Sequence, residues 1–406
     1  MKIVVLKFGG TSVGTIEKIK KVAEIIAEYK KSNLKVIVIS SAMSGVTNDL
    51  IRKSKKISKD FSESEYDVLV SSGEQIACSL ISGRLIQKGF KSRSWMSWQV
   101  PIITVGPHKN SRINEIEKSK ILKYLKGGGI PIITGFQGIN LQNRITTIGR
   151  GGSDASAIMV AKFFKAERCI IYTDVEGVYT TDPNKLKRAK KIKVISYEEM
   201  LEMASLGARV MQPVSIQDAR LNRINIEVKS SFVKKSGTLI TKRSSIVNNK
   251  IITGISSTQN DSKISLIGVK DKPGVAASIF KPLSKNSINV DMVVQNISPN
   301  GKETDLTFTI KTEDLKKTKK IILENTNINF RKLLIEKGVS KISVIGVGMI
   351  TTPGVTFRMF QALANKNINI KVISTSEIKI SVLINKKNTK KALIALHKEF
   401  KLDNKK

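Results

Sequence analysis

The sequence contains only two cysteines and two histidines among 406 residues, and this scarcity excludes several kinds of site. Cys78 and Cys169 lie far apart, and neither has the spacing of a metal ligand, so we expect neither a disulfide framework nor a structural zinc site. This cysteine usage fits a reducing cytoplasm. His108 and His397 lie outside every motif described below and are expected to be ordinary surface or packing residues.

We also expect no targeting signal at the start of the sequence. Met1 to Leu6 is a short apolar strand followed at once by Lys7 and two glycines, which is neither a cleavable signal peptide nor a membrane span. The hydrophobic content of 40% provides for buried cores, and the length allows two or three domains. We therefore expect a folded, soluble, cytoplasmic protein.

Acidic residues are few compared with basic ones. The 33 Asp and Glu residues stand against 70 Lys and Arg residues, which gives a formal net charge of +37. A clustered basic face would bind a nucleic-acid backbone. The lysines are instead spread along the chain, without an arginine-rich arm or a basic strand bearing aromatic residues. We interpret the charge as a solvated surface that binds polyanions weakly, and we expect no specific nucleic-acid partner.

From Met1 to about Val228, apolar strands alternate with amphipathic helices. This alternation predicts an α/β domain whose parallel-rich sheet is flanked by helices. Its ligand loops should lie at the carboxyl ends of the strands. The predicted strands are Lys2 to Leu6, Leu34 to Ser40, Val100 to Thr104, Ile130 to Thr134 and Cys169 to Thr173, and helices are predicted from Thr15, Ser64, Ser153 and about Glu198.

The last third of the chain repeats itself. Three pairs of segments correspond: Ile264 to Lys270 with Ile342 to Gly348, Pro273 to Val275 with Pro353 to Val355, and Ile288 to Val290 with Ile368 to Ile370. Each copy contains a strand, a Pro-Gly turn, a helix, two strands and a helix. This is the order of a ferredoxin-like βαββαβ module, so we expect two such modules.

The two modules are expected to be interleaved in the sequence. The first closes with a strand near Asn329 to Glu336, whereas the second ends at a helix, Thr389 to Phe400. We infer that Ile251 to Ser257, an apolar strand without another partner, closes the second module. The expected organisation is a large α/β domain at 1–233, a linker at 234–250, a first module at 264–340, and a discontinuous second module at 251–263 and 341–406.

Two glycine-rich loops suit anion binding. Lys7-Phe-Gly-Gly-Thr11 directly follows a strand, so its glycine N–H groups and Lys7 can surround an anion, although a plain glycine turn is the alternative for this segment alone. Its spacing is not that of a Walker A loop. The second loop, Gly149-Arg-Gly-Gly-Ser-Asp154, precedes a helix whose N-terminus favours phosphate or carboxylate. Helix capping by Ser153 or Asp154 would explain only one of its residues.

Two further segments offer polar groups at strand ends. Thr173 to Pro183 combines carboxylates, an aromatic ring and hydroxyls, which suits a nucleotide, although a Gly/Pro-rich turn is the alternative. Ser40 to Thr47 offers hydroxyl groups to a small polar substrate.

Together these segments resemble the aspartate kinases, or aspartokinases. The resemblance is carried by Lys7 to Val13, Ser71 to Glu74, Gly149 to Asp154, Thr173 to Pro183 and Ile373 to Ile378, and it spans essentially the whole chain. It implies the amino-acid kinase fold followed by two ACT domains. It also implies transfer of the ATP γ-phosphoryl group to the side chain of L-aspartate, giving 4-phospho-L-aspartate, the first step toward lysine, threonine and methionine. The absence of a histidine base agrees, because a carboxylate acceptor is already ionised near pH 7.

The resemblance also implies roles for individual residues. Lys7, with the amides of Gly9 and Gly10, should hold the transferring phosphates, and Asp154 should orient Lys7 or the metal-bound phosphates. Arg150 should clamp the substrate α-carboxylate, and Glu74 should accept its α-ammonium group. Further substrate contacts are implied for Thr47, Gly151, Gly152 and Ser153, and further nucleotide contacts for Ser41, Thr173, Asp174, Tyr179, Asp182 and Arg209.

For Glu74, the alternative is an exposed, solvated position on an amphipathic helix. The expected cofactor is ATP with Mg2+, where phosphates and water mainly coordinate the magnesium ion and no protein metal site is needed. Three positions depart from the family pattern. Glu176 replaces a usual Asp, Arg209 replaces a common Lys, and Val214 replaces a frequent basic residue, so only the last change removes a charge.

The ACT modules imply an oligomer that pairs through their sheets and binds lysine or threonine, or both. The effector residues implied by similarity are Asp271, Gly274, Val275, Asn289, Asp291 and Gln295 in the first module, and Val355, Thr356, Asn369, Ile370, Ser376 and Glu377 in the second. Pro273-Gly274 also has a purely structural interpretation as a turn. The sequence leaves open which effector acts, the oligomeric state, and whether a shorter regulatory subunit accompanies the chain.

Three rival functions remain for comparison. A kinase of the same fold that acts on glutamate, acetylglutamate or a nucleoside monophosphate is disfavoured by the tandem modules and by Ser71 to Glu74. A catalytically silent amino-acid sensor is disfavoured by the intact set of Lys7, Arg150, Asp154 and Asp174. A nucleic-acid-binding protein is suggested only by the charge. Because no homoserine dehydrogenase extension follows Lys406, we expect a monofunctional enzyme.

Overall fold

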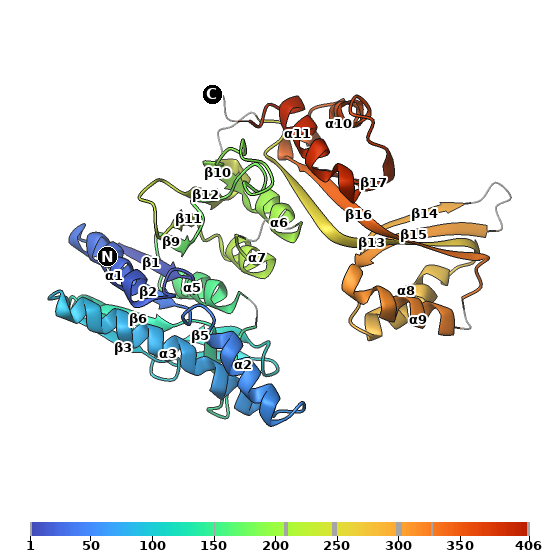
Figure 1. The fold of residues 1–406 in the computed structure, drawn as a ribbon. Coiled ribbons are helices and arrows are strands. Elements are labelled where there is room, and N and C mark those ends of the chain that lie inside the picture. The colour runs from blue at the N-terminus through green and yellow to red at the C-terminus, as the bar shows by residue number, and fades with distance from the viewer. Residues whose placement is uncertain are drawn as a thin grey trace. The chain divides into compact units, whose positions relative to one another are not determined.

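The computed structural model describes residues 2–149, 151–206, 210–245, 250–297, 303–325 and 328–403. Its contacts divide the chain into two compact units (Figure 1). The first contains residues 1–178 and 191–248, and the second contains residues 179–190 and 249–406. No helix in these described ranges is long and apolar enough to cross a membrane.

The first unit contains an eight-stranded sheet in the order β10-β12-β11-β9-β1-β2-β6-β3. All of its strand pairs are parallel except β11 with β12, so the predicted parallel-rich α/β fold is confirmed. The strands are β1 (Ile3–Phe8), β2 (Lys35–Ser40), β3 (Ser92–Trp95), β6 (Ile130–Thr134), β9 (Arg168–Thr173), β10 (Val194–Ser196), β11 (Ile226–Ser230) and β12 (Thr238–Thr241).

Helices cover both faces of the central strands. Alternate residues of β1, among them Leu6 and Phe8, join a buried cluster with residues of α1 and α3, whereas α5 also contacts β1, β2 and β9. Because successive side chains of a strand point to opposite faces, Lys7 faces away from the α1–α3 cluster. The helices are α1 (Ile16–Lys31), α2 (Val46–Ile57), α3 (Glu63–Gln87), α4 (Ser119–Lys126), α5 (Gly152–Phe163), α6 (Tyr197–Ser205) and α7 (Pro213–Asn222).

A separate four-stranded sheet in the first unit has the order β5-β4-β7-β8. Its strands are β4 (Ile102–Val105), β5 (Arg112–Ile116), β7 (Gln137–Ile139) and β8 (Ile145–Thr147). The strand expected at Val100 to Thr104 in the main sheet is therefore β4 of this smaller sheet, where it pairs antiparallel with β5. The apolar pattern of a strand indicates burial but does not identify its partner.

The second unit contains a six-stranded sheet in the order β14-β15-β13-β16-β18-β17. The strands are β13 (Gly254–Lys270), β14 (Val290–Ile297), β15 (Glu303–Lys311), β16 (Lys332–Ile345), β17 (Ile370–Ser376) and β18 (Lys379–Asn385). The helices are α8 (Val275–Lys285), α9 (Leu315–Glu324), α10 (Val355–Ala364) and α11 (Thr389–Glu399). Short 3-10 turns occupy η1 (Arg243–Ser245), η2 (Thr312–Asp314), η3 (Val347–Ile350) and η4 (Lys386–Asn388).

Two long strands, β13 and β16, extend through both repeats and pair with each other in each of them (Figure 1). Residues 254–258 of β13 pair with residues 341–345 of β16, and residues 263–267 pair with residues 332–336. The register shifts between these two halves, and each half adjoins its own buried core. The sequence led us to group the strand at Ile251 to Ser257 with the second repeat, and its residues lie beside that repeat's β16 residues.

Residues 179–190 belong to the second unit by their contacts, although the sequence boundary at 1–233 groups them with the first. The Ile255 amide donates a hydrogen bond to the Thr180 carbonyl oxygen at 2.7 Å. Lys185 Nζ donates to the Ser257 carbonyl oxygen at 2.9 Å, and Ala189 forms an antiparallel bridge with Asp403. These contacts group residues 179–190 with the sheet of the second unit.

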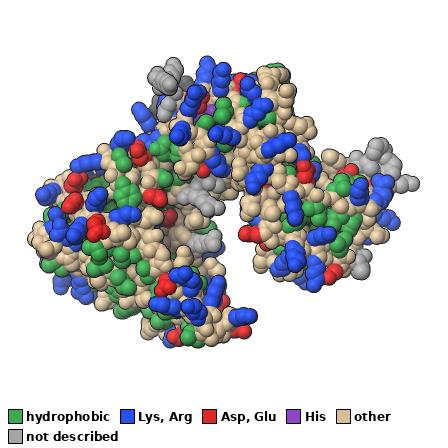
Figure 2. All heavy atoms as spheres, in the orientation of Figure 1, with side chains coloured by type: hydrophobic (Ala, Val, Ile, Leu, Met, Phe, Trp, Pro, Cys, Tyr) green, Lys and Arg blue, Asp and Glu red, His purple; other side chains and the backbone are tan. Residues whose placement is uncertain are grey.

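The charge is distributed over the visible surface. Figure 2 shows lysine and arginine side chains on both units, with acidic side chains between them. This distribution agrees with a solvated surface more than with a single basic binding face.

Candidate functional site

A buried ion pair joins the end of β1 to the start of α5. Lys7 Nζ lies 2.6 Å from Asp154 Oδ1, and the two side chains are only 11% and 10% exposed. Asp154 occupies the first turn of α5, where the helix dipole favours a carboxylate. The pair fixes a lysine ammonium group in a poorly hydrated place at the carboxyl end of the sheet.

Close packing requires glycine at the second of the two positions after Phe8, Gly10. A Cβ atom on Gly9 would lie 3.4 Å from Lys7 Nζ, and one on Gly10 would lie only 2.9 Å from the Ala42 carbonyl oxygen. Any larger residue at Gly10 would therefore push the loop after β2 away. This arrangement leaves a backbone that a phosphate group can approach.

Three strand-end loops converge next to this pair. The Gly9 amide donates to the Tyr172 carbonyl oxygen at 3.2 Å, which ties the glycine loop to the end of β9. The Ser41 amide donates to the Phe8 carbonyl oxygen at 3.0 Å, which ties the end of β2 to β1. The structure thus gathers the expected nucleotide-side residues Ser41, Thr173 and Asp174 at the sheet edge that carries Lys7.

Glu74 is buried in α3, with 3% of its surface exposed, so the alternative of a solvated glutamate is wrong. Its Oε1 accepts a hydrogen bond from the Ala42 amide at 3.0 Å. Its Oε2 has no hydrogen-bond partner in the part of the chain that the structure describes. Burial raises the pKa of Glu74 to about 8, although the Ala42 amide acts in the opposite direction. A buried carboxylate with one unpaired oxygen can bind a cation such as an ammonium group.

The second glycine loop is also tightly packed. Gly149 and Gly151 both have φ of 77°, in the left-handed region that glycine tolerates, and the Gly152 amide donates to the Gly149 carbonyl oxygen at 3.0 Å. A Cβ atom on Gly151 would lie 2.5 Å from Gln212 Cγ. Ser153 is buried in the first turn of α5, beside Asp154.

Several expected site residues cannot be placed with this cluster. Arg150 and Arg209 lie outside the described residues. Tyr179 and Asp182 group with the second unit, where Asp182 Oδ1 accepts the Asn184 amide at 2.9 Å. Thr47 is half-buried in the first turn of α2, which follows the loop after β2.

Two of the departures from the family pattern can be described. Glu176 lies 3.6 Å from Lys191 and 3.5 Å from Lys235 through its two carboxylate oxygens, so its charge is compensated locally. Val214 is 64% exposed near the start of α7, and nothing in the structure explains its substitution.

The sequence did not reveal a second buried carboxylate on α3. Asp67 is fully buried, and its Oδ2 lies 2.7 Å from Nδ1 of the partly buried His108, so of the two roles expected for His108, surface or packing, the structure favours packing. The available signal was the spacing of Asp67 and Glu74, because residues seven apart lie on the same side of a helix.

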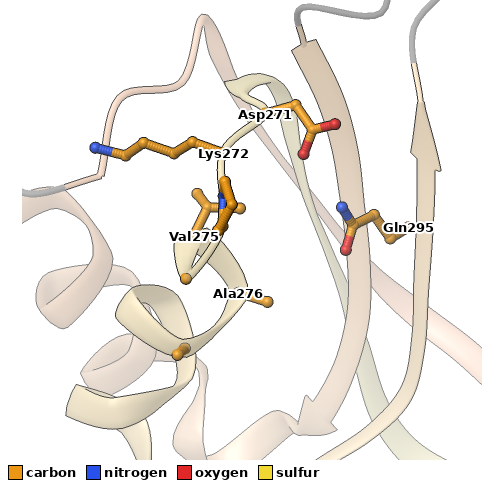
Figure 3. A pocket seen from close by; sticks show the side chains of 8 residues that line it. Asp271, Lys272, Val275, Ala276 and Gln295 are labelled. Atoms are coloured by element: carbon orange, nitrogen blue, oxygen red, sulfur yellow. The ribbon is translucent and has the colours of Figure 1, made fainter.

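A cavity of about 610 Å³ lies beside the turn before α8 in the second unit. Figure 3 shows the side chains of Asp271 and Gln295 directed toward one another across it, whereas Lys272 extends away. Gly274 precedes α8 with φ of 88°, as the Pro-Gly turn requires. Four of the expected effector residues line this cavity: Asp271, Gly274, Val275 and Gln295.

The other expected effector residues are dispersed in the structure. The Asp291 carboxylate pairs with the buried Lys341, and the pair holds the pKa of Asp291 below its usual value even though burial acts to raise it. Val355 belongs to the core of the second repeat. The remaining positions are exposed or half-buried: Asn289, Thr356, Asn369, Ile370, Ser376 and Glu377.

No group of three or more His, Cys, Asp or Glu side chains in the described ranges could hold a metal ion.

Comparison with known protein families covers both units. Residues 2–230 match the amino acid kinase family, and residues 264–325 and 342–400 match the ACT domain. The aspartate kinase of Pseudomonas putida is 43% identical over 406 residues, covering 99% of this chain and 98% of that protein. Aspartokinase 2 of Bacillus subtilis is 41% identical over 403 residues, with the same shares covered.

Solved structures of an aspartokinase are also similar to this chain. Escherichia coli aspartokinase III in complex with aspartate and ADP has a TM-score of 0.79 at 25% identity, covering 98% of this chain and 99% of that one. The same enzyme in complex with lysine and aspartate has a TM-score of 0.81 at 25% identity, covering 98% of this chain and all of that one.

The raised pKa of Glu74 predicts a dependence of stability on pH. Between the ordinary value of 4.5 and the folded-state value of about 8, the folded protein holds one more proton than the unfolded chain. Rising pH in this window therefore lowers the free energy of unfolding. Glu74→Gln should remove this contribution, so the variant should gain stability relative to the parent by on the order of a few kcal/mol between pH 5 and pH 8.

Urea unfolding at several pH values measures this difference, with the exposed Glu63→Gln on the same helix as control. A constant difference between Glu74→Gln and the parent across the window would contradict the assignment of a proton to Glu74.

Proposed function

Because this chain belongs to the aspartokinases of the amino acid kinase family, we propose that it transfers the γ-phosphoryl group of ATP to the side-chain carboxylate of L-aspartate. The product is 4-phospho-L-aspartate. The observation that carries the proposal is the combination of a buried cation for phosphate, Lys7, with a buried carboxylate for an ammonium group, Glu74. The aspartate and ADP named in the complex of the E. coli relative support the same pair of ligands.

The Lys7–Asp154 pair supplies the electrostatic part of this reaction. Phosphoryl transfer to a carboxylate brings two anions together, so catalysis requires positioning and charge neutralisation more than proton transfer. Lys7 is held by Asp154 in a place with little water, where its attraction for phosphate oxygens is strong. The amides of Gly9 and Gly10 lie on the same loop and add hydrogen-bond donors.

Recognition of aspartate follows from the opposite charges of its two α-groups. Glu74 Oε2 receives the α-ammonium group, and Arg150 clamps the α-carboxylate through a bidentate contact. Further contacts with the bound aspartate come from Thr47, Gly151, Gly152 and Ser153. With both α-groups fixed, the extra methylene of glutamate would misplace the reacting carboxylate by roughly 1 Å, enough to cost about a hundredfold in rate.

No residue of the chain needs to act as a base. The acceptor carboxylate is ionised near pH 7 and attacks as it is. ATP supplies the phosphoryl group, and a magnesium ion bound with it would be coordinated mainly by phosphate and water. Ser41, Thr173 and Asp174 contact the nucleotide, and the family resemblance assigns Arg209, Tyr179 and Asp182 to the same ligand.

We also propose that the second unit senses an end product of the pathway that this reaction begins, namely lysine, threonine or both. The cavity beside α8 combines the Asp271 carboxylate with the N-terminal amides of a helix, which suit the ammonium and carboxylate groups of an amino acid. Lysine is named in the complex of the E. coli relative. Pairing of ACT modules between chains would give a homo-oligomer, and an inhibitory coupling of about 1–3 kcal/mol would be typical.

The proposed reaction is tested by incubating the purified protein with ATP, magnesium and L-aspartate and trapping the acyl phosphate as its hydroxamate. Aspartate should be converted, glutamate should react at least a hundredfold more slowly, and Lys7→Met should lower kcat by roughly 10²- to 10³-fold. The exposed Lys2→Met, one residue before the strand that carries Lys7, is the matched control. Absence of turnover in folded protein would reject the catalytic proposal in favour of a silent amino-acid sensor.

The proposed effector site is tested by measuring inhibition of this reaction by lysine and by threonine, singly and together. Asp271→Asn and Gln295→Ala should raise the inhibitory concentration roughly tenfold or more, because each removes a polar contact, while the uninhibited kcat stays unchanged. The equivalent positions of the second repeat give the controls Thr351→Ala and Thr375→Ala. Equal effects of both pairs would contradict a site in the first module.

A further inference from the structure

Asp67 lies in α3 with none of its surface exposed, and three donors converge on its carboxylate. Thr147 Oγ1 donates to Oδ1 at 2.6 Å, and His108 Nδ1 lies 2.7 Å from Oδ2. The Lys109 amide donates to both oxygens, at 3.2 and 3.1 Å. These donors come from two different segments, the end of β8 and the loop at residues 106–111.

The loop at residues 106–111 has a conformation that depends on these contacts. Gly106 and Lys109 both have positive φ, of 101° and 66°, and Lys109 is a residue that rarely adopts this region. Its amide is held by Asp67. The loop is also tied to β8, because the Ser111 amide donates to the Thr147 carbonyl oxygen at 3.0 Å. Asp67 therefore fastens the loop and the strand to one point of α3.

Both segments adjoin the second glycine loop, β8 along the chain and the loop at residues 106–111 by packing. Gly149 follows Thr147 by two residues, and a Cβ atom on Gly149 would lie 2.6 Å from Asn110 Oδ1 and 3.1 Å from the Lys109 carbonyl oxygen. The loop at 106–111 thus packs against the backbone of Gly149. The hydrogen bond from the Gly152 amide to the Gly149 carbonyl oxygen connects Gly149 to the first residue of α5.

The same helix carries Glu74, seven residues further along. Two turns of helix separate these carboxylates by about 10 Å along the axis and leave them on one side. Both are buried, at 0% and 3% exposure. One rigid helix therefore holds Glu74 directly and holds the flanks of the second glycine loop through Asp67.

We propose that Asp67 is a positioning residue for aspartate, because it sets the spacing between the ammonium-binding Glu74 and the described glycines of the second glycine loop, Gly149, Gly151 and Gly152. This inference rests on the proposed function. Asp67 touches no reacting atom. Its loss lets the glycine loop move relative to α3, which weakens aspartate binding while the phosphate-binding loop after β1 stays in place.

The experiment compares Thr147→Val with Thr147→Ser, because the first removes the hydroxyl donor with little change of shape and the second retains it. Thr147→Val should raise the KM for aspartate roughly tenfold, with KM for ATP and kcat changed less than twofold. Thr147→Ser should stay close to the parent. The control is Glu63→Gln, which removes the exposed ion pair between Glu63 and Lys109, 3.1 Å apart, on the same helix and loop.

Asp67→Asn and His108→Ala extend the test to the other contacts and should raise the KM for aspartate in the same way. If Asp67→Asn fails to fold, Thr147→Val and His108→Ala decide the question. An unchanged KM for aspartate in these folded variants, or an equal rise of KM for both substrates, would overturn the inference and leave Asp67 with a purely structural role.

Amide hydrogen exchange of the peptide spanning residues 145–156 provides a readout without substrate. The Thr147→Val variant should exchange at least severalfold faster there than the parent, whereas peptides from β1 and β2 should not change. Unchanged exchange would overturn the inference even if the parent proves inactive. Absence of aspartate turnover in the parent would instead reject the proposed function, so the two failures are distinguishable.

Discussion

The rest of the site depends on one ion pair, between Lys7 and Asp154. Removing two charges from water is costly, and the pair is stable only because both partners are held rigidly, Lys7 by a central parallel strand and Asp154 by the first turn of α5. Close packing of Gly10 against Ala42 and the bond from Gly9 to Tyr172 bring neighbouring strand ends to the same place. The topology of the sheet therefore determines where a phosphate group can be held.

The site presents opposite charges to the two proposed ligands. A cation lies where phosphate oxygens would bind, and the unpaired oxygen of Glu74 lies where a substrate ammonium group would bind. Burial gives Glu74 a pKa of about 8, so this carboxyl group is mostly protonated near pH 7 until a cation arrives. The helix that carries Glu74 also carries Asp67, which binds Thr147 and the loop at residues 106–111. In the proposed function, substrate recognition thus depends on α3, and phosphate binding depends on β1 and α5.

Local patterns in the sequence were sufficient to predict the parallel-rich sheet, the glycine loops and the internal repeat. Strand periodicity and glycine placement are local properties of the chain. They could not identify the partner of β4, because an apolar strand pattern does not specify its neighbour. They could not reveal the burial of Glu74 or the contact of His108 with Asp67, because these depend on segments far apart in sequence. The grouping of residues 179–190 with the second unit also depends on contacts between segments far apart in sequence, so local patterns could not reveal it. Arg150 and Arg209 lie outside the described residues.

The most direct test of this account is calorimetric titration of the protein with L-aspartate at pH 7, in buffers of different ionisation enthalpy. If the α-ammonium group binds the buried Glu74 carboxylate, binding must ionise that group and release about one proton, and the release should fall close to zero at pH 9, where Glu74 is already ionised. A binding enthalpy at pH 7 that is independent of the buffer would contradict the assignment of Glu74 as the ammonium-binding group.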